Sequence, residues 1–253
     1  MPRGDLDCVE FVEGAADSRL LLIADHASNR VPPGIELGIP AALFEDHIAV
    51  DIGAGPLSRA LAHRLDCPAV LAAWTRLVVD LNRESDEPNV IPASSDGWAV
   101  PGNEALTRAQ RDERILRYWR PYHAFIEARI AAAAPAMLIG IHSFTPQLAS
   151  SPHEKRPWQV GMLYNLDDRA AKLALRLLRE AGIATGDNQP YSGRDLNATM
   201  NRHAEAHGLP YLGFEVRQDL IADAAGVAQW AARLAPVIAS VAAALACGGA
   251  MDQ

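Results

Sequence analysis

The sequence predicts one three-layer α/β domain in which helices cover both faces of a central sheet. Two observations lead to this prediction: short apolar runs alternate with longer helical patterns, and several runs are apolar at successive positions. A continuously apolar strand is typical of a sheet that is buried on both faces, whereas a strand with one wet face alternates. Strands that alternate with helices then give the layered architecture.

Five apolar runs are the predicted strands. They span residues 19–25, 68–81, 136–144, 158–165 and 210–216. Helices are predicted at residues 54–65, 107–134, 167–181 and 226–246. The second helix opens with Thr107 and carries Gln110 three positions later, which matches a capping box, and Gly182 is the expected C-cap of the third. Residues 83–103 are rich in proline and glycine and are predicted to form a long loop, a feature that is often functional.

Residues 1–253 are predicted to form a single domain that is large enough to fold without disulfides. The net charge of −8 disfavours a nucleic-acid partner. The three cysteines are scattered without a disulfide or metal-binding spacing, which indicates a reducing compartment. The N-terminus lacks a signal-peptide pattern and the chain lacks an apolar run of about 18 residues, so we expect a cytoplasmic protein with no membrane partner.

Polar side chains follow four of the predicted strands at their carboxyl ends, which is where open α/β sheets bind ligands. These side chains are His26, Asn82 with Arg83, His142 with Ser143, and Glu215. The two imidazoles could hold Zn²⁺, with a carboxylate and water completing the site. Glu215 lies between Phe214 and Val216, where an idle carboxylate is costly, so we predict that it is the general base.

Arg76, Arg83 and Arg217 are candidates for binding a substrate carboxylate, because guanidinium groups bind carboxylates through two parallel hydrogen bonds. A structural salt bridge is the alternative for each of them. Arg83 is preferred because it follows Asn82 at a strand end.

Three further residues have two interpretations each. Asp51 precedes a glycine-rich turn and a helix, so it is either the helix N-cap or a metal ligand. Asn188 lies in a turn-rich segment that either binds substrate or is only a turn. His203 lies on a short helical pattern and is either a solvated or a catalytic histidine.

Six segments in order resemble the N-formylglutamate amidohydrolase family. They are LLIADHASNRVP, RLVVDLNRESDEPNVIP, GIHSFTP, RPWQVGMLYN, GDNQPYSG and GFEVRQDLIAD, and the resemblance covers roughly residues 19–240. It is closer to the broad branch with HASN and IHSFTP than to the histidine-degradation enzyme. The family is similar in fold to zinc carboxypeptidases, which implies a mostly parallel mixed sheet.

The resemblance also implies roles for individual residues. His142 matches the last zinc histidine of the carboxypeptidases, Glu215 their catalytic glutamate, and Asn82 with Arg83 their substrate-carboxylate segment. Where carboxypeptidases have a glutamate zinc ligand, this chain has Asn29, which is a weak ligand. We therefore expect Asp51 to be the third metal ligand, with Asn29 as the alternative.

The resulting hypothesis is a divalent-metal enzyme, with zinc expected, that hydrolyses an N-formyl or other N-acyl amino acid. Metal-activated water attacks the acyl carbonyl with Glu215 as base, and Arg76 or Arg156 stabilises the oxyanion. His203 is a further catalytic candidate. The predicted substrate-binding residues are Asn82, Arg83, Ser143, Arg156, Asn188 and Arg217.

Two alternatives stay open at this point. One is a peptidase or peptidoglycan-type amidase, which an open groove would favour over a closed pocket. The other is a non-catalytic protein that binds an acidic metabolite. A serine hydrolase is disfavoured because the chain has no G-x-S-x-G motif. The acyl group, the amino acid and a homo-oligomeric state are not defined by the sequence.

Overall fold

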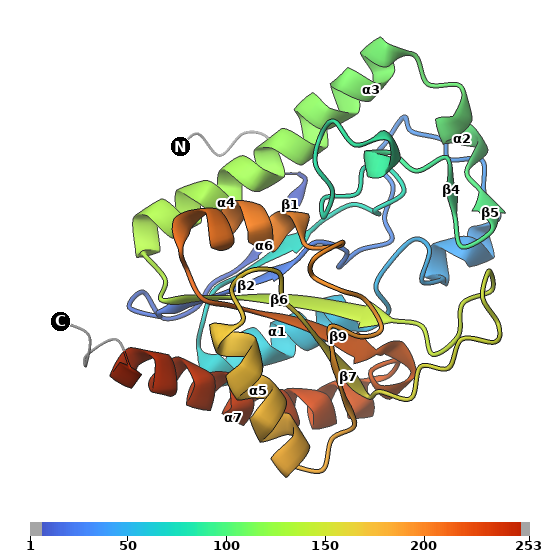
Figure 1. Cartoon of the computed structure of the whole chain (residues 1–253). Coiled ribbons are helices and arrows are strands. Elements are labelled where there is room, and N and C mark those ends of the chain that lie inside the picture. The colour runs from blue at the N-terminus through green and yellow to red at the C-terminus, as the bar shows by residue number, and fades with distance from the viewer. Residues whose placement is uncertain (1–6, 249–253) are drawn as a thin grey trace.

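The computed structural model describes residues 7–248 and has a seven-stranded sheet between two layers of helices (Figure 1). The strands of this sheet are β1 (Val9–Val12), β2 (Leu20–Ala24), β3 (Ala69–Ala72), β6 (Met137–Phe144), β7 (Val160–Leu163), β8 (Thr185–Asp187) and β9 (Tyr211–Arg217). All residues of β3, β6 and β7 are buried, as the continuously apolar runs predict. The predicted α/β fold class is therefore confirmed.

The strand order is β1-β3-β2-β6-β9-β7-β8. Strands β3, β2, β6 and β9 are parallel, while β1 pairs antiparallel with β3, and β7 pairs antiparallel with β9. The sheet is thus mixed and mostly parallel. Its central strands β2, β6 and β9 have their carboxyl ends at one edge, which is where ligands bind in sheets of this type.

One face of the sheet is covered by α1 (Ala54–Leu65), α5 (Arg169–Glu180) and α7 (Ala224–Gly248) (Figure 1). Helix α7 buries Trp230, Leu234, Ile238 and Val241, which recur at helical spacing. By length and composition α7 would also qualify as a membrane span, which is weak evidence because core helices meet the same criterion.

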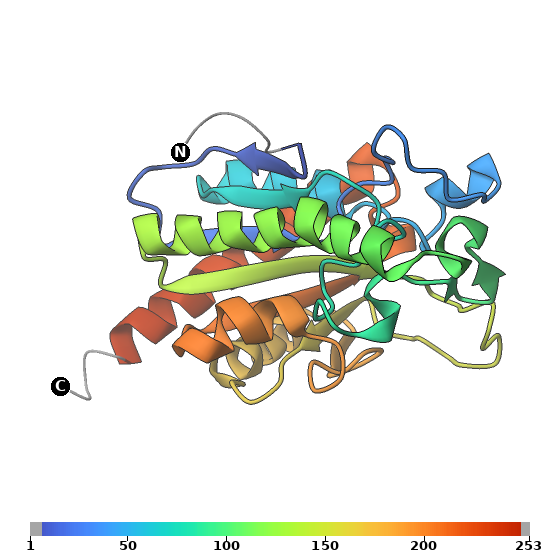
Figure 2. The same ribbon diagram turned by 90° about the horizontal axis from the view of Figure 1, so that it is seen from above.

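The opposite face is covered by a long helical segment and by α6 (Ala198–His203) (Figure 2). The long segment consists of α3 (Arg108–Arg114), a π-helical stretch (Ile115–Trp119) and α4 (Arg120–Ala133). Its predicted capping box is present, since the Thr107 side chain accepts from the backbone N–H of Gln110 and the Gln110 side chain accepts from the backbone N–H of Thr107. The predicted helix at residues 107–134 is therefore confirmed, with a π-helical interruption.

Two parts of the predicted secondary structure are wrong. The strand predicted at residues 68–81 ends at Ala72, because the chain turns at Thr75, whose N–H donates to Arg30 O and whose hydroxyl donates to Ala49 O. Residues 83–103 are also not one plain loop. They contain a 3₁₀ turn (Pro88–Val90), a small hairpin of β4 (Ser94–Ser95) with β5 (Trp98–Ala99), and α2 (Pro101–Glu104).

Three more 3₁₀ turns complete the described chain, at Ala41–Glu45, Glu205–His207 and Gln218–Leu220. Gly182 has a φ of 72° and follows α5, as its predicted role in the helix C-cap requires.

Candidate active site

Three predicted residues lie together at the carboxyl edge of the sheet. His26 follows the end of β2, His142 lies on β6, and Glu215 lies on β9. His142 and Glu215 are register partners on adjacent parallel strands, so their side chains leave the sheet on the same side. All three side chains are almost completely buried.

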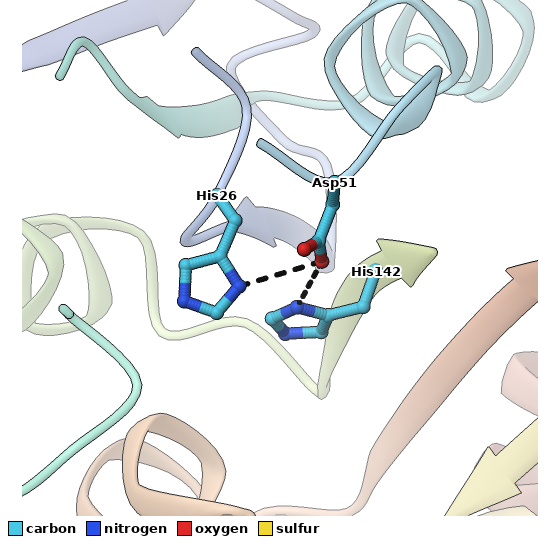
Figure 3. Close-up of side chains that lie close together, drawn as sticks. All are labelled: His26, Asp51 and His142. Carbon is cyan, nitrogen blue, oxygen red and sulfur yellow. Dashed lines mark hydrogen bonds and ion pairs between the residues drawn. The ribbon is translucent and has the colours of Figure 1, made fainter. Parts of the chain in front are cut away.

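Asp51 joins this group from the loop before α1. Its Oδ2 lies 2.9 Å from Nδ1 of His142 and 3.4 Å from Nδ1 of His26 (Figure 3). The same oxygen accepts from the backbone N–H of Ser143 at 3.2 Å. Asp51 is not the N-cap of α1, because that position is occupied by Gly53. Gly53 has a φ of 80°, and a Cβ there would lie 2.2 Å from the carbonyl oxygen of Ile221, so the turn that aims Asp51 requires glycine.

The outer nitrogens of both imidazoles face further carboxylates. Nε2 of His26 lies 2.8 Å from Oδ1 of Asp80, and Nε2 of His142 lies 3.5 Å from Oδ2 of Asp25. Asp25 is itself held by the hydroxyl of Tyr122, which donates to Oδ1 at 2.8 Å. Carboxylates on the outer nitrogen orient metal-binding histidines and make them better ligands. Both rings therefore direct Nδ1 towards Asp51.

These three residues fit a divalent metal ion. One donor atom from each of His26, Asp51 and His142 lies within 4.8 Å of the others. Among the described residues, three buried carboxylates, at positions 25, 51 and 80, contact the histidines, and the guanidinium of Arg76 forms ion pairs with two of them. With neutral histidines, these three carboxylates and one guanidinium leave two negative charges for a cation to balance, before Glu215 is counted.

The raised pKa values of the two histidines show likewise that the surrounding carboxylates favour positive charge at this place. Burial lowers both pKa values, but Asp80 and Asp51 raise that of His26 above its usual range. Asp25 and Asp51 raise the pKa of His142 further still. Asn29, the alternative third ligand, hydrogen-bonds to Glu45 instead, so among the described residues Asp51 is the carboxylate that meets both histidines.

Glu215 combines burial with an uncommitted oxygen. Burial and the nearby Asp51 raise its pKa to about 7, against the opposing effect of His142. Within residues 7–248, Oε2 of Glu215 has no hydrogen-bond partner. Opposite Glu215 on β7 stands Gly161, where a Cβ would lie only 3.3 Å from Cβ of Glu215. A carboxylate of this kind can exchange a proton near neutral pH.

Arg76 reaches the same group from the loop after β3. Its Nη2 donates to Oδ2 of Asp80 at 2.6 Å, and its Nη1 donates to Oδ1 of Asp51 at 3.3 Å. Burial alone would lower the pKa of Arg76, but the two aspartates raise it above its usual range. The guanidinium is thus a fixed positive charge beside the two histidines.

A cavity of about 300 Å³ opens over these residues. Its volume suits a small molecule. Asn82, Arg83 and Ser143, three of the predicted substrate-binding residues, also line it. The Ser143 hydroxyl has no hydrogen-bond partner in the described chain, while Oδ1 of Asn82 accepts from the N–H of Thr199 at 3.0 Å. Further lining residues are His47, Ser95, Asp96, Phe144, Thr145, Leu148, Ser150, Tyr191 and Leu196.

Four predicted site residues lie outside this lining. His203 is completely buried on α6, where its Nε2 lies 2.8 Å from Nδ1 of His123, and it is neither solvated nor beside the cavity. Arg217 forms an ion pair with Asp219 at 2.7 Å, although it lies two residues after Glu215. These two positions do not support direct contact with a substrate.

Asn188 and Arg156 hold the chain around the cavity instead. Oδ1 of Asn188 accepts from the backbone N–H groups of Tyr164 and Gly193, which makes it a turn-forming residue. The guanidinium of Arg156 donates to the hydroxyl of Tyr191 at 3.0 Å and stacks over its ring at 4.9 Å. Since Tyr191 lines the cavity and Arg156 does not, Arg156 holds this lining residue in place through these two contacts.

Sequence reasoning did not single out Asp25, His47, Asp96 or Tyr191. The signal for Asp25 was its position directly before His26 at the strand end. Loop residues such as Asp96 gave no such signal, because their place in the site depends on how distant segments fold together.

Similarity to known proteins indicates the family of this chain. The profile of the N-formylglutamate amidohydrolase family matches residues 18–222. A gene product of Agrobacterium tumefaciens of known structure is 30% identical, with a TM-score of 0.88 over 94% of this chain and 96% of that chain. An N-formylglutamate amidohydrolase from Ralstonia eutropha is 18% identical and shares the fold, with a TM-score of 0.77 over 96% of this chain and 100% of that one.

A local match to a UPF0178 protein of Burkholderia vietnamiensis is 31% identical over 105 residues, which is 40% of this chain and 63% of the length of that protein.

Proposed function

This chain belongs to the N-formylglutamate amidohydrolase family, and from that membership and the geometry of the site we propose that it hydrolyses the amide bond of an N-formyl or other N-acyl amino acid. The observation that carries the proposal is the convergence of His26, Asp51 and His142 beside the uncommitted carboxylate of Glu215. We also propose that the protein acts in the cytoplasm and on a small molecule.

A divalent metal, with zinc as the expected ion, would be held by His26, Asp51 and His142, where it would polarise water and the acyl carbonyl. Glu215 takes the proton of the attacking water, since its pKa of about 7 lets it act as a base near neutral pH. As the amide C–N bond breaks, Glu215 returns this proton to the leaving amine nitrogen. The products are a carboxylate and a free amino acid.

Two arginines have separate roles in this proposal. Arg76 keeps a fixed positive charge beside the reacting carbonyl and stabilises the oxygen on which negative charge develops. Arg83 binds the α-carboxylate of the substrate, because its only ion pair in the described chain is a distant one, 3.8 Å from Glu87. Asn82 and Ser143 offer polar groups beside it.

The size of the cavity favours this proposal over a peptidase or a peptidoglycan amidase. A volume of about 300 Å³ accommodates one acylated amino acid, whereas a polymer segment of several residues needs more room. The unpartnered Glu215 carboxylate favours catalysis over simple binding, because a passive binding site gains nothing from an unpaired buried acid.

The test is hydrolysis of N-formyl and N-acetyl amino acids by the zinc-loaded protein, followed through release of the free amino acid. The matched control is the same compound with its α-carboxylate converted to an amide. We expect turnover of the acid and at least about a hundredfold lower kcat/KM for the amide, since Arg83 then loses its charged partner. Absence of turnover across the panel with folded, metal-loaded protein would reject the proposed function.

A further inference from the structure

The cavity lining includes His47, Ser95, Asp96, Leu148 and Ser150, which we call the outer wall, and the Asp96 carboxylate connects its segments. Asp96 lies in the turn between β4 and β5, with a φ of 41°. It accepts hydrogen bonds from the backbone N–H of Ala149 at 2.8 Å and of Ser150 at 2.9 Å, and also from the Ser150 hydroxyl. Its Oδ2 also lies 3.0 Å from Nε2 of His47. Three segments that are distant in sequence thus meet at Asp96.

This outer wall carries negative charge. Burial would raise the pKa of Asp96, but the hydrogen bonds from Ser150, Ala149 and His47 lower it to about 2, so the side chain is an anion. His47 lies between Asp96 and a second carboxylate, that of Asp46. Two carboxylates share one imidazole, so the group of three stays net negative even when His47 is protonated.

The cavity lining in the described chain offers one guanidinium to a ligand. Arg76 is already bound by Asp80 and Asp51. Among the described residues that line the cavity, Arg83 is then the arginine with only a distant partner, Glu87 at 3.8 Å. One substrate carboxylate therefore finds a cation. A second carboxylate would share the cavity with the Asp96 carboxylate, and no second arginine of this kind is found among the described lining residues.

We propose that the substrate is an N-acyl amino acid whose α-carboxylate is its only carboxylate, and that Asp96 determines this specificity by repelling a second one. This inference rests on the proposed function and narrows its substrate class. Like-charge contact in a partly dehydrated cavity is a common means of rejecting a competing ligand. The remaining wall residues, Ser95, Leu148 and Ser150, suit a neutral polar or apolar side chain.

The experiment compares N-formyl-L-glutamine with N-formyl-L-glutamate, which have nearly the same shape and differ by one charge. Affinity is measured by calorimetry and hydrolysis by amino-acid release, both on zinc-loaded protein. We expect the wild-type protein to favour the glutamine compound by at least about tenfold. Equal affinity and equal hydrolysis rates for the two compounds, or a preference for the glutamate compound, would overturn the proposal.

Asp96→Asn should bring the ratio of the affinities for the glutamine and glutamate compounds close to one. The matched control is Asp112→Asn, which removes one negative charge from an exposed ion pair with Arg108 outside the cavity lining, and should keep a ratio near that of the wild type. If Asp96→Asn does not fold, Leu148→Lys places a cation on the same wall and should shift the ratio towards the glutamate compound. An unchanged ratio in a folded wall variant contradicts the role of Asp96.

Measuring binding as well as hydrolysis distinguishes failure of this inference from failure of the proposed function. Selective binding of the glutamine compound without hydrolysis would reject the proposed catalysis while supporting the charge selection. Hydrolysis with preference for the glutamate compound would support the catalysis and reject the charge selection. Failure of both compounds to bind would reject both.

Discussion

His142 and Glu215 are register partners on the adjacent parallel strands β6 and β9, so a predicted metal ligand and the predicted base rise from the same face of the sheet. Both positions are fixed by backbone hydrogen bonds of the central strands. A site built on strands keeps its geometry more strictly than one built on loops. Substitution of either side chain should therefore change the chemistry more than the fold.

Glu215→Gln should lower kcat by about 10²–10⁴-fold, because an amide cannot accept the proton of water. Glutamine has nearly the same size, so the melting temperature and the amount of bound zinc should stay close to the wild-type values. Steady-state kinetics together with metal analysis test this. Wild-type turnover in the variant would eliminate Glu215 as the base.

Asp80→Asn should weaken zinc binding by about 10–100-fold, because Asp80 orients His26 through a 2.8 Å contact with Nε2. Competition with a chromogenic chelator measures this affinity. Asp96→Asn is the matched control, since it removes another largely enclosed carboxylate, one whose histidine partner is His47 and not His26 or His142. Equal zinc affinity in the two variants would show that Asp80 does not support the metal site.

The buried pair His123 and His203 should make the protein sensitive to acid. Burial lowers the pKa of His123 to about 3, with a further contribution from His203, and burial lowers the pKa of His203 to about 4. In the unfolded chain both titrate near pH 6.5. Between about pH 6.5 and pH 4 the unfolded state therefore binds more protons, and the free energy of unfolding falls as the pH falls.

Each histidine should contribute about 1.4 kcal/mol per pH unit within that window. Urea unfolding at pH 7.5, 5.5 and 4.5 measures the slope. His203→Gln removes one titrating group and should reduce the slope by about that amount. An identical slope in the variant would mean that His203 is protonated in the folded protein as readily as in the unfolded one.

Gly53→Ala should destabilise the fold by more than about 3 kcal/mol, because its left-handed backbone adds strain to a steric clash with the Ile221 carbonyl. Gly182→Ala is the control, since Gly182 has a similar φ of 72° but open space where the new Cβ would lie. It should cost only about 1 kcal/mol. Thermal unfolding of both variants separates the cost of backbone strain from the cost of the clash. An equal loss of stability in the two variants would contradict the proposed clash with Ile221.

Much of the fold followed from the sequence because the central strands are continuously apolar. The two strands of the seven-stranded sheet that were missed, β1 and β8, lie at its edges and have only 4 and 3 residues. The sequence of β8, Thr-Gly-Asp, has little strand propensity, and its pairing with β7 depends on the neighbouring strand. Edge strands of this kind are decided by tertiary contacts.

The site could be predicted where a residue lies on or directly after a strand, as with His26, His142 and Glu215. Loop residues and helix faces were less predictable. His203 is a plausible candidate in sequence, but packing of α6 against His123 encloses it. Arg156 and Asn188 hold neighbouring segments of the chain in place and do not line the cavity. This structural role depends on contacts between residues that are 35 and 24 positions apart, which the sequence does not show.

The central claim is that His26, Asp51 and His142 hold a divalent metal. The most direct measurement is metal content by plasma mass spectrometry of untagged protein purified without chelators, beside the variants His26→Ala and Asp51→Asn. We predict close to one equivalent of metal, with zinc expected, in the wild-type protein and its loss in both variants. Folded wild-type protein that binds no divalent metal even after reconstitution would contradict the account.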